Sequence, residues 1–110
     1  MIFNDVVNVT LKEKRTVSGT ATFVTIFSGP VPGVVTFLDS GTTFDPAGGK
    51  TSSRLQIILS PFAFTIPPNA GSSALVMAWG PFTALSPEGA VEPHYLRGRL
   101  HHYEMIAKAI

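Results

Sequence analysis

Apolar and polar residues alternate along much of this chain, which is the pattern of β strands with one buried face. Val7, Val9 and Leu11 show it most clearly, because a single polar residue separates each of them from the next. Other segments are rich in β-branched and aromatic residues, which also favour strands. The strands predicted in this way comprise residues 7–11, 16–27, 34–38, 54–59, 62–66, 74–79, 82–85 and 95–106.

Glycine and proline separate these segments and indicate loops between them. The predicted loops and turns comprise residues 28–33, 39–41, 45–50, 67–71, 80–81 and 86–89, together with a charged turn or exposed edge at 12–15. A helix fits the sequence only at residues 104–110, so the crossover helices that parallel strands need are missing. We therefore predict that residues 1–110 form one all-β domain, an antiparallel β-sandwich of seven to eight strands, with a small closed β-barrel as the alternative.

Charged residues are unevenly placed. They make up 14% of the chain, yet only four of the 72 residues from Thr16 to Pro87 are charged. Sheet proteins usually carry charges on exposed strands and edges, which prevents association with other copies. Hydrophobic residues make up 45% of the chain, so part of the uncharged surface is apolar. This distribution predicts a non-enzymatic interaction or structural module that works as a homo-oligomer or within a larger assembly.

The composition argues against several other kinds of function. The chain has no cysteine, which excludes disulfides, thiolate metal sites and thiol catalysis. Its net charge of +1 gives no general attraction to nucleic acid. No apolar run has the length of a transmembrane helix. The N-terminal residues lack the apolar core of a signal peptide, so we expect none, and the cellular compartment stays open.

Histidine and glutamate gather towards the C-terminus, where the candidate catalytic residues are Glu92, His94, His101, His102 and Glu104. Residues two apart share one face of a strand, so Glu92 is expected beside His94 and His102 beside Glu104. Such imidazole–carboxylate pairs serve acid–base catalysis or bind metal ions. Adjacent His101 and His102 are expected to point to opposite faces of the strand. We therefore predict no metal site and no cofactor, and an interaction role before a catalytic one.

Aromatic residues supply the candidate ligand-binding positions Phe37, Phe64 and Trp79. In the barrel alternative they would line an apolar pocket with Phe23 and Phe62, and the histidines would act with a carboxylate at its mouth. A third interpretation is a lectin-like or membrane-binding β-sandwich, in which Trp79 contacts a sugar ring or the membrane interface.

The stretch from Gly19 to Gly41, GTATFVTIFSGPVPGVVTFLDSG, resembles the central strands of bacterial immunoglobulin-like repeats. These repeats carry a Thr/Val-rich strand, a Pro-Gly turn and a V-T-F-x-D-x-G strand, here with Pro32 and Gly33 as the turn. The resemblance extends over residues 17–80, and the segment from Pro81 onwards departs from it. It implies a non-enzymatic adhesive or spacer module and supplies no functional residues.

Overall fold

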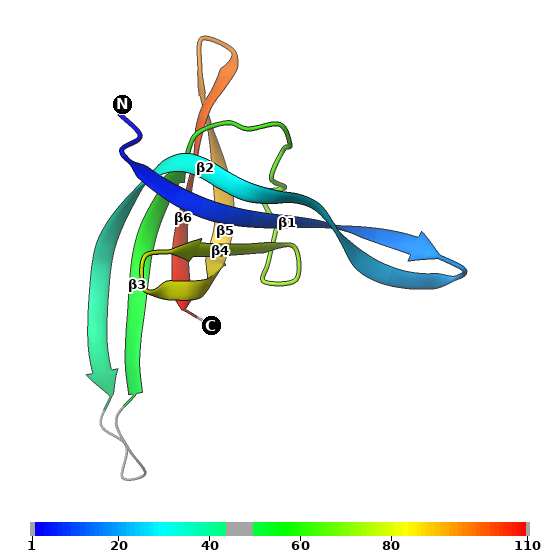
Figure 1. The fold of residues 1–110 in the computed structure, drawn as a ribbon. Helices are drawn as coiled ribbons and strands as arrows, with labels where there is room; N and C mark the ends of the chain where they lie inside the picture. The colour runs from blue at the N-terminus through cyan, green and yellow to red at the C-terminus, as the bar shows by residue number, and fades with distance from the viewer. Residues whose placement is uncertain (1, 44–49, 110) are drawn as a thin grey trace.

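The structure, a computed structural model, describes residues 2–43 and 50–109, and the side chains of residues 2–38 and 54–109. Those ranges contain no helix and six strands: β1 (Asp5–Val17), β2 (Thr20–Thr43), β3 (Lys50–Leu59), β4 (Leu75–Trp79), β5 (Phe82–Leu96) and β6 (Arg99–Ala109). The strands form a closed antiparallel barrel in the order β1-β2-β3-β6-β5-β4, in which β4 pairs with β1 (Figure 1). The all-β prediction is confirmed. The sandwich of seven to eight strands is wrong, and the closed barrel that we expected as the alternative is the observed fold.

The barrel closes because β2 bends and changes its partner along its length. It pairs with β1 through residues 20–33 and with β3 from residue 33 onwards. Gly33 stands at the change, opposite Asp5 of β1 and Leu59 of β3. A Cβ atom at this position would lie 2.5 Å from the carbonyl oxygen of Ile58, so glycine is what allows β2 and β3 to approach this closely.

The loop predicted at residues 28–33 is therefore wrong, since this segment is the bend of β2. Pro30 and Pro32 lie inside the strand because they do not interrupt its pairing with β1. The backbone N–H of Ser60 donates to the carbonyl oxygen of Pro32 at 2.9 Å. The nitrogen and the carbonyl of one residue point to the same side of a strand, so the ring nitrogen of Pro32 faces away from β1. Pro30, two residues earlier, has the same orientation.

Side chains fill the interior of the barrel. Val7, Val9 and Leu11 point inwards from β1 and are at most 1% exposed, as their alternation predicted. The other buried hydrophobic residues are Val31, Leu55, Ile57, Leu59, Ile66, Ala70, Leu75, Met77, Leu85, Val91, Tyr103, Met105 and Ala107. A barrel of six strands is narrower than the eight-stranded barrels that hold a small ligand, so its interior is a packed core.

The strand predicted at residues 62–66 is wrong, because the chain from residue 60 to residue 74 forms no strand. Pro61, Pro67 and Pro68 lack the N–H groups that a ladder needs. The segment is held instead by single contacts with the barrel. The backbone N–H of Ile66 donates to the buried hydroxyl of Tyr103 at 3.2 Å. Ile66 itself is 1% exposed, so this segment adds side chains to the core.

Two tight turns also differ from the prediction. Ser18 and Gly19 join β1 to β2, and Arg97 and Gly98 join β5 to β6. All four residues have positive φ angles, between 52° and 79°, which are the angles of the two-residue turns that connect antiparallel strands. Residues 12–15 therefore continue β1 as an exposed edge, and the strands predicted at residues 16–27 and 95–106 each contain a turn. Residues 104–109, where the sequence also allowed a helix, belong to β6.

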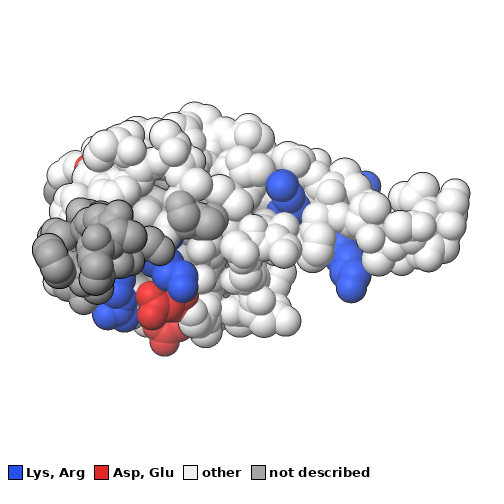
Figure 2. Space-filling view, turned by 90° about the horizontal axis from the view of Figure 1, so that it is seen from below, with Lys and Arg blue, Asp and Glu red and all other residues white. Residues whose placement is uncertain are grey.

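The hairpins extend beyond the barrel and make the molecule flat and broad, with extents of 46 × 43 × 21 Å. Its radius of gyration is 15.4 Å, against about 13 Å for a compact domain of similar length. Figure 1 shows the β1–β2 hairpin projecting far from the barrel on one side, while the β2–β3 and β5–β6 hairpins leave it in other directions. On the face seen in Figure 2, charged side chains gather in a few places and most of the surface is uncharged.

Candidate functional site

Three of the candidate catalytic residues meet on the outer face of the β5–β6 hairpin. His94 of β5 lies directly opposite His102 of β6, and Glu92 lies opposite Glu104. Residues that face one another in an antiparallel pair project to the same side of the sheet. Tyr103 is fully buried in the barrel, so its neighbours His102 and Glu104 project to the outside.

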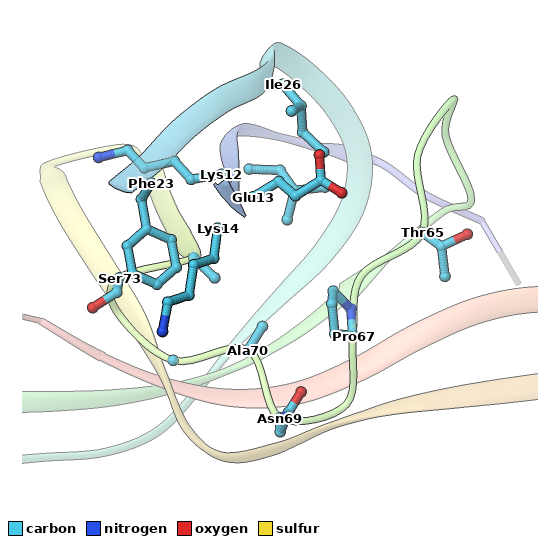
Figure 3. Close-up of a pocket in the computed structure, with 13 residues that line it drawn as sticks. Lys12, Glu13, Lys14, Phe23, Ile26, Thr65, Pro67, Asn69, Ala70 and Ser73 are labelled. Atoms are coloured by element: carbon cyan, nitrogen blue, oxygen red, sulfur yellow. The ribbon is translucent and has the colours of Figure 1, made fainter. Parts of the chain in front are cut away.

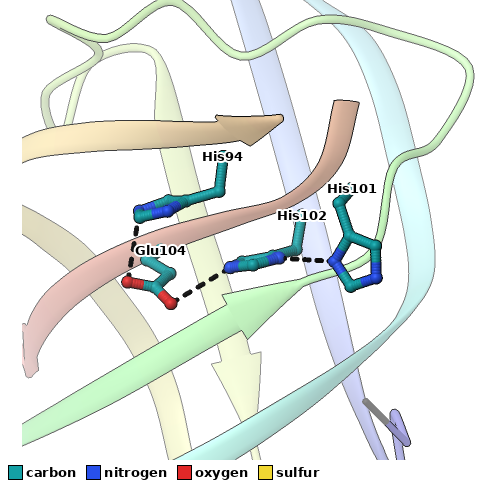
Figure 4. Close-up of polar contacts among 4 residues, drawn as sticks. All are labelled: His94, His101, His102 and Glu104. Atoms are coloured by element: carbon teal, nitrogen blue, oxygen red, sulfur yellow. Dashed lines mark hydrogen bonds and ion pairs between the residues drawn. The ribbon is translucent and has the colours of Figure 1, made fainter. Parts of the chain in front are cut away.

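The carboxylate of Glu104 lies between the two imidazole rings (Figure 4). Its Oε1 atom is 3.0 Å from Nε2 of His102, and its Oε2 atom is 3.2 Å from Nε2 of His94. The two rings are stacked with centroids 4.8 Å apart and an interplanar angle of 7°. The His94 side chain is 41% exposed, whereas Glu104 is 27% and His102 11% exposed. The cluster is therefore open to solvent on the His94 side.

His94 differs from His102 in how its nitrogen is satisfied. The Nε2 atom of His102 makes a hydrogen bond with Glu104. The Nε2 atom of His94 is buried and has no hydrogen-bond partner, although it lies within ion-pair distance of the same carboxylate. A buried polar atom without a partner is uncommon in native structures, and a bound ion or a catalytic role is one explanation for it.

The third histidine, His101, joins the cluster through an irregularity in β6. His94 pairs with His102 and Tyr95 with Leu100, so His101 is an extra residue, a β-bulge. The bulge turns its side chain so that its Nδ1 atom lies 2.7 Å from Nδ1 of His102. The expectation that His101 and His102 point to opposite faces is therefore wrong. It would hold for a regular strand, but a bulge brings adjacent side chains together.

The register of β5 also depends on an irregularity. From Glu88 to Glu92 the chain advances four residues in β5, while its partner β6 advances two residues, from Ile106 to Glu104. The turn predicted at residues 86–89 is thus a bulged part of β5. Glu92 is exposed and lies opposite Glu104, and it is not among the donor residues that lie within 4.8 Å of one another. The predicted Glu92–His94 pair is replaced by a carboxylate that His94 and His102 share.

Hydrogen-bond contacts connect the Glu104 carboxylate to the His102 ring, and the His102 ring to the His101 ring. One of the two facing Nδ1 atoms of His101 and His102 must carry a hydrogen and donate it to the other. When His102 donates from Nε2 to Glu104, its Nδ1 accepts from His101, and Nε2 of His101 is left as an acceptor. When His102 donates from Nδ1 to His101, its Nε2 is free to bind a cation. These three linked side chains can therefore transfer a proton, or His102 can supply a metal-binding nitrogen.

The candidate ligand-binding residues lie in two separate aromatic clusters. Phe37 contacts Trp79 and Phe82, with ring centroids 5.9 Å apart in each pair. Phe64 contacts Phe27 at 6.0 Å, on another part of the barrel. Phe37 and Phe64 are both exposed. Sequence reasoning singled out Trp79 but not Phe82, whose ring is nearly parallel to that of Trp79.

A groove of about 480 Å³ lies between the β1–β2 hairpin and the segment from residue 65 to residue 74. Phe23 is the one candidate aromatic residue that lines it. Figure 3 shows Phe23 and Lys14 pointing from the hairpin towards the chain around Ala70 and Ser73. The side chains of Lys12, Glu13 and Lys14 bring charge to an otherwise mostly apolar groove. Phe37, Phe64 and Trp79 do not line it, so a shared pocket for them stays a prediction.

Comparisons with known proteins assign this chain to no family. No helix in residues 2–43 or 50–109 is long and apolar enough to cross a membrane. The resemblance of residues 17–80 to bacterial immunoglobulin-like repeats stays a prediction, and Pro32 and Gly33, its expected turn, lie within β2. No protein-family model and no curated protein matches the chain.

Proposed function

We propose that this protein is a non-enzymatic assembly module that binds further copies of itself through its projecting hairpins. The observation that carries the proposal is the outer part of the β1–β2 hairpin, residues 13–25, which we call the arm. Every residue of the arm is exposed, although all but the two turn residues belong to regular strands. A two-stranded hairpin with both faces in water is marginally stable. An ordered arm of this length is therefore expected to pack against a neighbour.

The arm carries apolar side chains on both of its faces. Phe23 lies opposite Lys14 and faces the groove, with 46% of its surface exposed. Val24 lies opposite Glu13, and it shares the other face with Val17, which is 60% exposed. Burial of such side chains contributes free energy to association, about 25 cal/mol for each Å² of apolar surface removed from water.

The edges of the arm also favour association. β1 pairs with β4 only through residues 8–11, and β2 pairs with β3 only from residue 33 onwards. Within the described structure, the outer edges of residues 13–17 and 20–25 therefore face no strand. Their backbone N–H and C=O groups can accept a strand of another molecule, which is a common mode of protein association.

A second copy of this chain is the partner that these features fit best. The same molecule also exposes apolar residues on its other hairpins, namely Phe37 and Leu38 on β2 and Tyr95 and Leu96 on β5. It has a groove at the base of the arm that an apolar side chain can enter. The net charge of +1 produces little repulsion between copies. The tip of the arm and the groove at its base lie at different places on the molecule, which favours head-to-tail contacts that build rings or filaments.

The test is the mass of the protein in solution, measured by light scattering behind a sizing column over a range of concentrations. We expect a defined oligomer. The variant Phe23→Thr keeps a residue that favours strands but removes the ring, and it should shift the protein towards the monomer. Thr22→Ser, at the adjacent position on the opposite face, is the matched control and should keep the oligomer. A monomer at the highest attainable concentration, or an oligomer insensitive to Phe23→Thr and to the double variant Val17→Thr with Val24→Thr, would overturn the proposal.

A further inference from the structure

The strongest unassigned feature is the His94–His102–Glu104 cluster on the outer face of β5 and β6. Two imidazole nitrogens and a carboxylate oxygen from these residues all lie within 4.8 Å of one another. We propose that this cluster binds one divalent transition-metal ion of the Zn²⁺ class. Two histidines and one glutamate are a known ligand set for zinc sites that keep an open coordination position.

The distances within the cluster suit ligands of one small ion. Zinc binds imidazole nitrogen and carboxylate oxygen at about 2.0–2.2 Å, so two ligands of a tetrahedral ion lie about 3.3 Å apart. The carboxylate of Glu104 is 3.0 Å from Nε2 of His102 and 3.2 Å from Nε2 of His94. The donors are held by paired strands, since His94 faces His102 across the ladder and Glu104 follows on the same strand. The two rings are stacked at 7°, so their nitrogen lone pairs do not converge on one point, and the partly exposed His94 ring has to rotate when the ion binds.

A second observation points to a missing partner at this place. Nε2 of His94 is buried and makes no hydrogen bond, although it faces the carboxylate that His102 also contacts. A metal ion between the donors would bind this nitrogen through its lone pair. It would also offset the negative charge of Glu104, for which the described structure provides no Lys or Arg partner within ion-pair distance.

His101 acts as a positioning residue for this site. Ligating histidines usually donate their second ring N–H to another polar group, which fixes the tautomer and the ring orientation. His102 has such a contact, since its Nδ1 atom lies 2.7 Å from Nδ1 of His101. With His102 as the donor, its Nε2 atom carries no hydrogen and faces Glu104, as a metal ligand requires. The β-bulge that places His101 here thus gives the Nδ1 hydrogen of His102 an acceptor when Nε2 binds a metal ion.

The donor set and its exposure define the class of ion. Two nitrogen donors favour zinc, copper, nickel or cobalt over calcium and magnesium, which prefer oxygen ligands. The exposed side of His94 leaves room for a water molecule as a further ligand. Because the ligands come from β5 and β6, the bound ion would link the two strands next to the bulge in β6.

The test uses the full chain without an affinity tag. Titration with Zn²⁺ in a calorimeter should give one ion per chain, and Co²⁺ should give the visible spectrum of a tetrahedral or five-coordinate ion that Zn²⁺ abolishes. His94→Gln and Glu104→Gln should each weaken Zn²⁺ binding by about tenfold or more. Both side chains are partly exposed, so these variants should fold, which far-UV circular dichroism can verify.

The matched control is Glu88→Gln, which removes a carboxylate of β5 that pairs with Arg54 and lies outside the cluster. It should bind Zn²⁺ like the unchanged protein. His101→Gln should weaken binding less than the two ligand variants, because His101 acts through His102. Failure of the unchanged protein to bind Zn²⁺, or equal affinity in the folded His94→Gln and Glu104→Gln variants, would overturn the proposal. The oligomeric state is measured separately, so either proposal can fail without the other.

Discussion

The barrel and the arm contain parts of the same two strands, yet they differ in what surrounds them. In the barrel, β1 alternates between buried and exposed residues, and Val7, Val9 and Leu11 pack into a continuous core. In the arm, both faces of β1 and β2 meet solvent. The comparison shows that regular strand geometry alone does not indicate where a protein gains its stability. The barrel is stabilised by its own side chains, whereas the arm depends on short-range pairing and, in our proposal, on other copies.

The largest expected effect separates the core of the barrel from the arm. Ile57 is fully buried in β3, so Ile57→Ala should lower the free energy of unfolding by about 2–5 kcal/mol. Val17→Ala in the arm removes a side chain that contacts solvent, and its effect should stay within about 0.5 kcal/mol for the monomer. Urea unfolding of both variants at low protein concentration measures the difference. Equal losses would show that the arm has a core of its own.

A smaller effect is expected where β2 leaves β1 for β3. In Gly33→Ala the new Cβ atom would lie 2.5 Å from the carbonyl oxygen of Ile58, which is backbone and has little freedom to move. Crowding of this kind costs about 1–3 kcal/mol. Gly71→Ala is the matched control, because nothing lies within 4 Å of its Cβ position. Thermal unfolding should show a lower midpoint for the first variant only, and unchanged midpoints would refute the close approach of β2 and β3.

The smallest expected effect concerns the turn at the end of the arm. Gly19 has a φ angle of 79° and no atom near its Cβ position, so Gly19→Ala is penalised by backbone conformation alone. The cost is about 1–2 kcal/mol for a residue other than glycine. Because the arm is far from the core, this loss should appear as faster hydrogen exchange in residues 13–25 and leave the barrel protected. Exchange that accelerates equally in the barrel would mean that the two regions unfold together.

Local pattern predicted the strands well where apolar and polar residues alternate without interruption, as in the first half of β1. Val7, Val9 and Leu11 behave as their alternation indicated. The same reasoning failed where glycine and proline occur inside a strand, because their effect depends on neighbouring strands. Pro32 is tolerated since its nitrogen faces away from β1, and Gly33 is required by the approach of β3. Neither condition can be inferred from residues adjacent in the chain.

In the candidate site, too, local spacing predicted some contacts, whereas others depend on strand pairing. The spacing of two residues correctly predicted that His102 and Glu104 meet. His94 joins them only because the turn at Arg97 and Gly98 and the bulge at His101 together set the register of β5 against β6. The Arg-Gly pair inside an apparently continuous strand was the available indication of that turn. The contact of His101 with His102 depends on a bulge, for which the local sequence carries no such indication.

The sequence by itself determined that the protein is a β protein without cysteine, with little charge between Thr16 and Pro87 and with histidine and glutamate near its C-terminus. These properties follow from composition and from the period of two that strands impose. The tertiary structure decided that the sheet closes into a barrel, that the arm leaves it and that His94 meets His102 and Glu104. The physical reason is that strand partners and register are set by contacts between residues far apart in the chain. A shift of the register by one residue would turn every side chain of a strand to the opposite face of the sheet.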